Sequence, residues 1–459
     1  MEDSIKQALM DIVGKENFTD SLIDLVSYSY DASDHDHRPE AAVWAHRVEE
    51  ISNILLLANA HRFPVTPRGA GTGLAGAAVP AIGGLVLDLS RMNKILDIRI
   101  VDRRVVVQPG VIFADLEKAL APHGFFFPPD PASGSVCTLG GNVATNAGGL
   151  RGAKYGVTRD YVLGLEVVLP DGRVMQTGSD CMKSVSGYDL TRLFVGSEGT
   201  LGIITEISLK INPKPLVSRT SLASFAGLEH AGRSVADIMH SGIIPSVLEI
   251  LDDNTLKVLR EQGGMNLPDV MAMVLVETDG YTEAEAAFQM AEVVDVFRKN
   301  RAVHIETADS AEAADELWRA RKSISGSVGQ LGANNVSEDV TVPISKVPSL
   351  LTGISEIVRK YKLPFVVFGH AGDGNLHPKI IFDRADPEQV KKVKHAVDEI
   401  FRLTCDLGGT LTGEHGIGLA KAPYMAWEHD RVALDVMRAL KRLFDPNNIL
   451  NPGKMSLED

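Results

Sequence analysis

Residues 138–149 read Thr-Leu-Gly-Gly-Asn-Val-Ala-Thr-Asn-Ala-Gly-Gly, and a Pro-Pro-Asp-Pro segment at 128–131 precedes them. The small side chains of this stretch allow a flat ligand to lie on the backbone, because glycine permits close approach. Asn142 and Asn146 add amide groups that can hydrogen-bond such a ligand. The stretch therefore predicts a ligand-binding loop.

Two more glycine-rich clusters flank this one. Residues 66–76 read Thr-Pro-Arg-Gly-Ala-Gly-Thr-Gly-Leu-Ala-Gly, and residues 196–204 read Gly-Ser-Glu-Gly-Thr-Leu-Gly-Ile-Ile. Glycines at such density allow successive N–H groups to form a nest for a phosphate. Residues 71–76 fit G-x-G-x-x-G, but the nicotinamide fingerprint needs a helix directly afterwards, and here a strand-like run follows. Three clusters in one presumed domain instead predict a large, extended, phosphate-bearing cofactor.

Length and charge limit the class of protein. With 459 residues the chain exceeds the size of a single core, so two or three domains are expected. Its 46 Lys and Arg against 60 Asp and Glu give a net charge of −14, and no dense basic stripe interrupts this balance. Nucleic acid is therefore excluded as an expected partner, whereas the acidic charge favours a basic protein partner.

The cysteines and the hydropathy pattern predict the compartment. Cys137, Cys181 and Cys405 are far apart with no Cys-x-x-Cys spacing, so neither a disulfide framework nor a thiolate-held cluster is indicated. The N-terminus has no apolar signal core, and no uncharged apolar run reaches the length of a membrane span. We expect a cytoplasmic chain, for which peripheral attachment to the inner face of a membrane through a partner complex stays open.

Hydrophobic periodicity outlines two halves that meet at the double-proline segment 212–215, because proline lacks a backbone donor and disfavours helix before it. An Asp171-Gly172 pair predicts a hairpin turn between two strands. Residues 1–26 have a helix-like pattern. Further expected helices are 47–63, 228–241, 283–299, 386–407 and 433–444, and expected strands are 84–89, 104–108, 163–169, 173–176, 201–211, 246–251 and 270–277.

Two histidines follow an apolar, strand-like run. Residues 366–378 read Val-Val-Phe-Gly-His-Ala-Gly-Asp-Gly-Asn-Leu-His-Pro, so a glycine-containing turn can fold His370 and His377 toward one point. Glu414 and His415 follow a second glycine turn. Two histidines and a carboxylate suit a catalytic divalent ion, although any one histidine taken alone is better explained as a hydrogen-bonded structural residue.

Taken together, these motifs are recognisable. Residues 67–76, the Pro-Asp-Pro and 140–149 segments, and residues 196–204 resemble the FAD-binding domain of the vanillyl-alcohol oxidase/p-cresol methylhydroxylase flavoprotein superfamily. The C-terminal half resembles the branch that contains D-lactate dehydrogenases, the D-subunit of glycolate oxidase and D-2-hydroxyglutarate dehydrogenases. The resemblance extends from about residue 30 to 454.

The resemblance implies a two-domain α+β fold of the p-cresol methylhydroxylase type. Residues 1–215, completed by about 425–459, would bind FAD, and residues 216–424 would form an α+β cap domain with an antiparallel sheet covered by helices. Asn451 would either touch the flavin or cap the last helix. The implied FAD-binding residues are Pro67, Arg68, Gly69, Ala70, Gly71, Thr72, Gly73, Leu74, Pro129, Asp130, Cys137, Thr138, Gly141, Asn142, Asn146, Ala147, Gly148, Glu198, Gly202, Ile204 and Asn451.

Some members of the superfamily hold flavin covalently through His or Cys. The 66–76 loop has neither, and Cys137 is expected to pack as a small hydrophobic residue. We therefore predict non-covalent FAD, with His35 and His37 as the remaining candidates for a tether.

The resemblance also assigns the reactive groups. His370, His377 and Glu414 would bind one divalent metal, with Zn favoured and Mn or Fe as alternatives, and the two histidines would also face the substrate. His415 would act as the base, which suits an imidazole whose ordinary pKa is near neutrality. If residues 414–415 are extended, Glu414 would face the metal and His415 the substrate.

Arg321, Ser325 and Lys379 are the expected substrate-binding residues of the cap. Arg321 matches the arginine that holds the substrate carboxylate in this family, and an arginine fork suits a carboxylate. The alternative is a solvated basic helix face, which fits Arg319 and Lys322 best. Where the hydroxyglutarate enzymes carry a lysine for the second carboxylate, this chain has Ser337. A short acid is therefore favoured.

The sequence thus predicts FAD-dependent oxidation of a short D-2-hydroxy acid, D-lactate or glycolate, to the 2-oxo acid, with hydride passing to flavin N5. D-2-hydroxyglutarate is the alternative substrate. A metal-dependent hydrolase and a non-catalytic FAD subunit are the alternative functions. Because three scattered cysteines cannot hold an iron–sulfur cluster, electrons would leave to a separate acceptor: an iron–sulfur subunit, an electron-transfer flavoprotein, a cytochrome, a quinone or oxygen. A homodimer is a further hypothesis.

Overall fold

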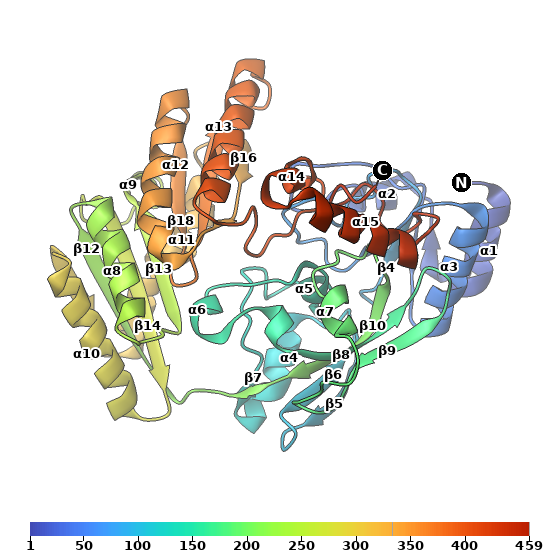
Figure 1. Ribbon diagram of the computed structural model, residues 1–459, viewed down its shortest axis with the longest axis horizontal. Helices are drawn as coiled ribbons and strands as arrows, with labels where there is room; N and C mark the ends of the chain where they lie inside the picture. The colour runs from blue at the N-terminus through green and yellow to red at the C-terminus, as the bar shows by residue number, and fades with distance from the viewer. Residues whose placement is uncertain (333, 459) are drawn as a thin grey trace. The chain divides into compact units, whose positions relative to one another are not determined.

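The computed structural model describes residues 1–332 and 334–458, which form two compact units (Figure 1). The first unit comprises Met1–Gly148, Val157–Lys214 and Glu414–Asp459, and the second comprises Gly149–Gly156 and Pro215–Gly413. The division at 214 lies where Lys214 N donates to Gly124 O and Leu216 N donates to Gly280 O. The second division falls at 413 rather than near 424, because residues 417 and 418 are held by Glu198 of the first unit.

Two main sheets form the first unit. The four-stranded sheet has the order β1 (Phe18–Thr19), β2 (Ala41–Trp44), β4 (Leu85–Asp88) and β3 (Val65–Arg68), with β2, β4 and β3 parallel. The antiparallel five-stranded sheet has the order β5 (Ile95–Arg99), β6 (Arg104–Val107), β10 (Ile203–Lys210), β8 (Val162–Val168) and β9 (Val174–Gly178). A short pair joins β7 (Phe125–Phe126) and β11 (Asn212–Pro213).

Helices cover these sheets and complete two hydrophobic cores. One core joins α1 and α3 to the four-stranded sheet, with Leu9, Ile51, Leu55, Val65 and Leu87 fully buried. The other joins α4 and α5 to the five-stranded sheet. The helices of this unit are α1 (Asp3–Val13), α2 (Leu22–Ser27), α3 (Val48–His61), α4 (Phe113–Leu120), α5 (Leu139–Thr145), α7 (Leu190–Phe194), α14 (Met425–Glu428) and α15 (Arg431–Phe444).

Local signals explain several of these elements. The β8–β9 hairpin turns at Gly172, whose φ is +81°, and Asp171 accepts a hydrogen bond from Arg173 N at 3.1 Å. This confirms the hairpin predicted from Asp-Gly. In contrast, the helix-like pattern of residues 1–26 divides into α1 and α2, because Gly14 at φ +85° ends α1 and the short strand β1 intervenes.

The glycine-rich stretch 138–149 differs from the expected loop. Leu139–Thr145 forms helix α5, and the Thr138 side chain caps it by accepting from Gly141 N at 3.3 Å. Asn146 ends the helix in the left-handed region at φ +53°. Threonine at the N-cap and asparagine at the left-handed position are typical helix end signals, so the end residues outweigh the low helix propensity of the glycines between them.

The second unit is built on one antiparallel sheet. Its order is β15 (His304–Thr307), β12 (Val217–Phe225), β14 (Ala272–Gly280), β13 (Val247–Asp252), β18 (Phe365–His370), β19 (Asn375–Phe382) and β16 (Asn334–Ser337), and β17 (Val340–Thr341) also pairs with β19. Its helices are α6 (Gly152–Tyr155), α8 (Leu228–His240), α9 (Asp253–Glu261), α10 (Glu283–Lys299), α11 (Ala311–Val328), α12 (Val347–Tyr361) and α13 (Pro387–Asp406).

Helices lie on both faces of this sheet (Figure 1). Helices α9 and α11 pack on one face, where Leu256 and Ile324 join a core with Leu275 and Phe368. Helix α10 packs on the other, where the rings of Phe225 and Phe297 lie 6.0 Å apart. The predicted cap of an antiparallel sheet covered by helices therefore describes the observed unit.

Strand register places four polar side chains of this unit on the face of the sheet that carries α9 and α11. Glu249 of β13 lies opposite His370 of β18, and Phe368 lies opposite His377 of β19. Because side chains alternate between faces along a strand, Glu249, His370, His377 and Lys379 all share the face of Phe368.

Candidate active site

The first unit contains a cavity of about 860 Å³. This volume is in the range expected for a cofactor pocket. We call it the cofactor cavity. Its walls come from the 67–74 loop, the start of α5, the 198–204 segment and the returning residues Glu414 and His415.

The 67–74 loop forms a cradle that side chains would fill. A Cβ added to Gly69 would overlap Thr138 Oγ1, and one added to Gly71, whose φ is +69°, would overlap the Arg68 guanidinium. That guanidinium donates to Ala78 O at 3.3 Å and lies over the Tyr28 ring at 5.6 Å. Burial lowers the pKa of Arg68, while nearby acidic groups oppose this shift. A buried guanidinium beside a glycine loop suits a phosphate group.

Two buried polar atoms of the cavity wall support a polar, extended ligand. Within the described residues, Asp31 Oδ2 and Asn142 Nδ2 are buried and have no hydrogen-bond partner. Leaving such groups unpaired is costly unless a ligand satisfies them. A carboxylate oxygen suits a sugar or ribityl hydroxyl, and an amide donor suits a ring carbonyl or nitrogen. The donor set, the glycine cradle and the cavity volume together fit FAD.

Most of the expected FAD-binding residues line this cavity. Pro129, Asp130, Asn146 and Asn451 do not. The residues of the predicted set that line it are Pro67, Arg68, Gly69, Ala70, Gly71, Thr72, Gly73, Leu74, Cys137, Thr138, Gly141, Asn142, Ala147, Gly148, Glu198, Gly202 and Ile204.

Two of the residues outside the wall, Asn146 and Asn451, have structural partners. Asn146 Oδ1 accepts from Arg159 N at 2.8 Å. Asn451 Nδ2 donates to Glu198 O at 2.7 Å and to Ala77 O at 2.9 Å, so it ties the C-terminal segment to two loops of the first unit. His35 and His37 are not among the lining residues. Burial raises the pKa of the Cys137 thiol, which favours its neutral form.

Glu198 anchors the chain that follows His415. Its carboxylate accepts hydrogen bonds from Ile417 N at 2.7 Å and Gly418 N at 2.8 Å. Burial raises the pKa of Glu198 to about 7, although these two N–H groups and the nearby Lys454 oppose the shift. The residue itself is in the left-handed region at φ +52°. Glu198 therefore fixes the loop whose first residues are Glu414 and His415.

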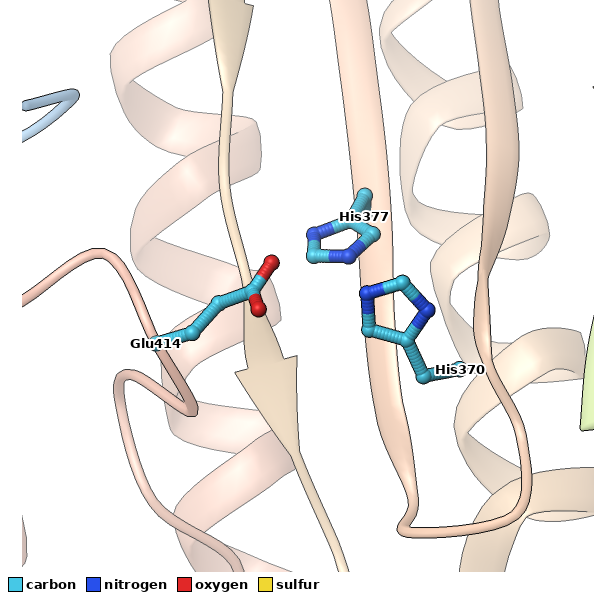
Figure 2. A group of neighbouring side chains, drawn as sticks. All are labelled: His370, His377 and Glu414. Carbon is cyan, nitrogen blue, oxygen red and sulfur yellow. The ribbon is translucent and has the colours of Figure 1, made fainter. Parts of the chain in front are cut away.

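His370, His377 and Glu414 form a second group, which we call the histidine cluster (Figure 2). One ligand atom from each lies within 4.8 Å of the others. The two imidazole rings are 4.9 Å apart at 81°, and Figure 2 shows the Glu414 carboxylate directed toward them. Glu414 follows Gly413, whose N donates to the Asp339 carboxylate at 2.9 Å. The donor set suits Zn²⁺ and other first-row divalent ions.

Glu249 supports the histidine cluster and was missed by the sequence analysis. It is 0% exposed, and its carboxylate accepts from His370 Nδ1 and from Arg321 Nε. Burial opposes its ionisation, but Arg321 and His370 together outweigh that cost and lower the pKa of Glu249 to about 2. The available signal was a single carboxylate inside the apolar run Val-Leu-Glu-Ile-Leu of 247–251, because buried charges require partners.

Arg321 and Lys379 lie against the same aromatic ring. The Arg321 guanidinium is 4.9 Å and the Lys379 ammonium 5.5 Å from the centre of the Phe368 ring. Burial lowers the pKa of Lys379, and the Arg321 charge adds to this effect. Lys379 makes no hydrogen bond or ion pair with the described residues. Ser325, one helical turn beyond Arg321, is exposed.

His415 lines the cofactor cavity, and its Nε2 is 3.9 Å from Glu414 Oε1. The two residues lie in a bend rather than in the extended segment that we expected. Glu414 also lines the cavity while its carboxylate belongs to the histidine cluster. Adjacent residues thus present a carboxylate to the histidines and an imidazole to the cavity.

Family models cover both halves of the chain. One described as "FAD linked oxidases, C-terminal domain" matches residues 214–455, and one described as "FAD binding domain" matches residues 39–178. The chain belongs to the FAD-linked oxidase family. It is therefore an FAD-dependent oxidoreductase, as the sequence predicted.

Relatives of this FAD-linked oxidase match nearly the whole chain. Glycolate oxidase subunit GlcD of Bacillus subtilis (strain 168) is 45% identical over 457 residues, which cover 99% of this chain and 97% of the relative. Glycolate oxidase subunit GlcD of Escherichia coli (strain K12) is 38% identical over 433 residues, covering 94% and 86%. D-lactate dehydrogenase of Anaerostipes hadrus is 36% identical over 426 residues, covering 91% and 90%.

Solved structures show the fold. p-Cresol methylhydroxylase with substrate bound superposes with a TM-score of 0.83 at 21% identity, covering 99% of this chain and 96% of that one. The predicted two-domain α+β fold of the p-cresol methylhydroxylase type is confirmed. Within the described residues, no helix is long and apolar enough to cross a membrane.

Proposed function

We propose that this FAD-linked oxidase converts a short D-2-hydroxy acid, D-lactate or glycolate, to the corresponding 2-oxo acid. The observation that carries the proposal is the pair Glu414 and His415, in which one residue joins the histidine cluster and the next lines the cofactor cavity. The relatives named glycolate oxidase subunit and D-lactate dehydrogenase support the same choice of substrate.

Arg321 is the residue that would bind the substrate carboxylate. Its Nε is held by Glu249, and a guanidinium has further donors that match a carboxylate fork. Ser325, on the same helix, would contribute a hydroxyl at the outer end of this site.

His415 would take the proton of the 2-hydroxyl group on a ring nitrogen, because imidazole is the side chain best suited to act as a base at neutral pH. FAD in the cofactor cavity supplies the acceptor for the hydride that leaves C2, so the substrate loses one proton and one hydride. His370, His377 and Glu414 would hold a divalent metal, with Zn²⁺ favoured and Mn²⁺ or Fe²⁺ as alternatives. Such an ion supplies Lewis acidity, which lowers the pKa of an alcohol.

D-2-hydroxyglutarate is a second candidate substrate because of the position of Lys379. Ser337, the site of the lysine expected in hydroxyglutarate enzymes, lies directly opposite Lys379 in the β16–β19 pair. Facing residues in such a pair have Cβ atoms about 5 Å apart. Lys379 would therefore restore a cation close to the place where the lysine is missing, and a second carboxylate would satisfy it.

Electrons from the reduced flavin would leave to a separate acceptor. The relatives named as a subunit support an assembly with other chains. An iron–sulfur subunit, an electron-transfer flavoprotein, a cytochrome or a quinone would each be a suitable electron acceptor. We also propose a cytoplasmic location for the chain.

An anaerobic titration of the flavin with a panel of acids tests the proposal. D-lactate or glycolate is expected to bleach the flavin absorbance of the metal-loaded chain, with L-lactate much slower. Faster bleaching by D-2-hydroxyglutarate would select the second candidate. No bleaching by any of these acids, with FAD and metal bound, would refute the proposed function.

A further inference from the structure

Glu249 is the one fully buried carboxylate in the described part of the chain that contacts both a histidine of the cluster and the arginine proposed for substrate binding. One oxygen, Oε1, faces His370 Nδ1, and the other, Oε2, faces Arg321 Nε. Three separate elements contribute these groups: strand β13, strand β18 and helix α11. A single side chain therefore connects two parts of the proposed chemistry.

The contact with His370 determines which ring nitrogen can bind a metal. Nδ1 of His370 faces Glu249 Oε1, so the hydrogen bond occupies this nitrogen and Nε2 is the ring nitrogen left for a metal. In Figure 2 the His370 ring presents its edge to His377 and Glu414. A carboxylate behind a ligating histidine fixes the ring orientation and raises the basicity of the ligand nitrogen.

The contact with Arg321 determines where the rest of the guanidinium points. Arg321 donates through Nε to Glu249, while its planar group lies 4.9 Å from the centre of the Phe368 ring. Fixing Nε and the plane of a guanidinium fixes its two terminal nitrogens as well, because the group is rigid and planar. Those nitrogens are the donors that a substrate carboxylate needs.

We propose that Glu249 is a positioning residue that sets His370 for metal binding and Arg321 for carboxylate binding at the same time. This inference rests on the proposed function for the identity of the substrate, but its metal-binding half does not. Loss of Glu249 should therefore weaken both metal binding and binding of the substrate carboxylate. Loss of Arg321 or of a nearby carboxylate should not weaken both.

The nearby carboxylate Glu277 offers a matched control. It lies on β14 on the same face of the sheet and accepts a hydrogen bond from Trp318 Nε1 of the same helix, α11, at 3.3 Å. It is also largely buried, and that burial raises its pKa. Within the described residues its carboxylate accepts hydrogen bonds from Trp318 and Ser246 and from no member of the histidine cluster. Glu277→Gln therefore perturbs the same layer of the cap without touching His370 or Arg321.

The test measures binding of Mn²⁺ alone to the full FAD-loaded chain, from the disappearance of the free-ion electron paramagnetic resonance signal. Glu249→Gln is expected to weaken Mn²⁺ binding about 10- to 100-fold, the range found when such supporting carboxylates are removed. Glu277→Gln and Arg321→Gln are expected to bind Mn²⁺ like the wild type. At saturating Mn²⁺, Glu249→Gln should still raise the KM for D-lactate, with a smaller effect on kcat.

A double variant guards against misfolding. Glu249→Gln with Arg321→Met removes the buried charge pair together, which proteins tolerate better than removal of one partner, and its Mn²⁺ binding should still be weakened. Wild-type Mn²⁺ affinity in both Glu249 variants, equal weakening in Glu277→Gln, or a wild-type chain that binds no Mn²⁺ would overturn the inference. If the wild type binds Mn²⁺ but oxidises neither D-lactate nor glycolate, the proposed function fails, and the Mn²⁺ measurements still decide the role of Glu249.

Discussion

Replacing Glu198 with glutamine should change how the stability of the FAD-binding unit depends on pH. Burial raises the pKa of this carboxyl from 4.5 to about 7. Between these two values the folded chain holds a proton that the unfolded chain has lost. The stability contribution of Glu198 is therefore fully present below about pH 4.5 and is lost as the pH rises through about 7.

The size of the effect follows from the shift. The folded and unfolded pKa values differ by 7 − 4.5 = 2.5, which at about 1.4 kcal/mol for each pKa unit corresponds to about 3 to 4 kcal/mol. Glutamine cannot ionise and resembles the protonated acid, with one oxygen for the N–H of Ile417 or Gly418. The two proteins should have similar stability at about pH 5, and the variant should be more stable by up to about 3 kcal/mol at about pH 8.

Urea unfolding at several pH values, with the same excess of FAD, measures this difference. Circular dichroism and flavin release report the transition, and the FAD affinity of each protein, measured at each pH, corrects for the contribution of bound FAD. A difference in unfolding free energy that stays constant between about pH 5 and about pH 8 would refute the reasoning, because the buried carboxyl would then titrate at its ordinary value.

Other predictions address the cavity, the base and the substrate. Gly69→Ala should lower FAD occupancy, since its Cβ would overlap Thr138 Oγ1, and adding Thr138→Ala should restore part of the occupancy. Full FAD occupancy in the single variant would contradict the proposal that the 67–74 loop holds FAD. His415→Ala should keep FAD and metal but slow flavin reduction by D-lactate about 100-fold or more, so an unchanged rate in stopped flow would exclude it as the base. Lys379→Ala should raise the KM for D-2-hydroxyglutarate more than the KM for D-lactate. Equal increases in the two KM values would show that Lys379 does not bind the second carboxylate of D-2-hydroxyglutarate.

Features set by neighbouring residues were accessible from the sequence. The Asp171-Gly172 hairpin, the change of unit beside the double-proline segment and the helices α3 and α10 follow from local turn chemistry and 3.6-residue periodicity. The three glycine clusters also predicted a cofactor-binding surface, because glycines at that density allow a ligand to approach the backbone closely.

Features set by long-range register were not accessible. Glu249 precedes His370 by 121 residues and Arg321 by 72, so their contact depends on the pairing of β13 with β18 and on where α11 crosses the sheet. The same holds for Ser337 and Lys379, whose pairing only the β16–β19 register reveals. Helix α5 was missed for a local reason, since its cap residues Thr138 and Asn146 outweigh the glycines that favoured a loop.

The most direct test of the central claim is single-turnover flavin reduction by D-lactate carrying deuterium at C2, compared with unlabelled D-lactate, under anaerobic conditions. If the bond between C2 and its hydrogen breaks as hydride leaves for the flavin, flavin reduction must be slower with the deuterated acid. The metal-loaded wild type should show this lower rate at saturating substrate as well. Flavin that stays oxidised with D-lactate and glycolate, or that is reduced faster by L-lactate, would contradict the account.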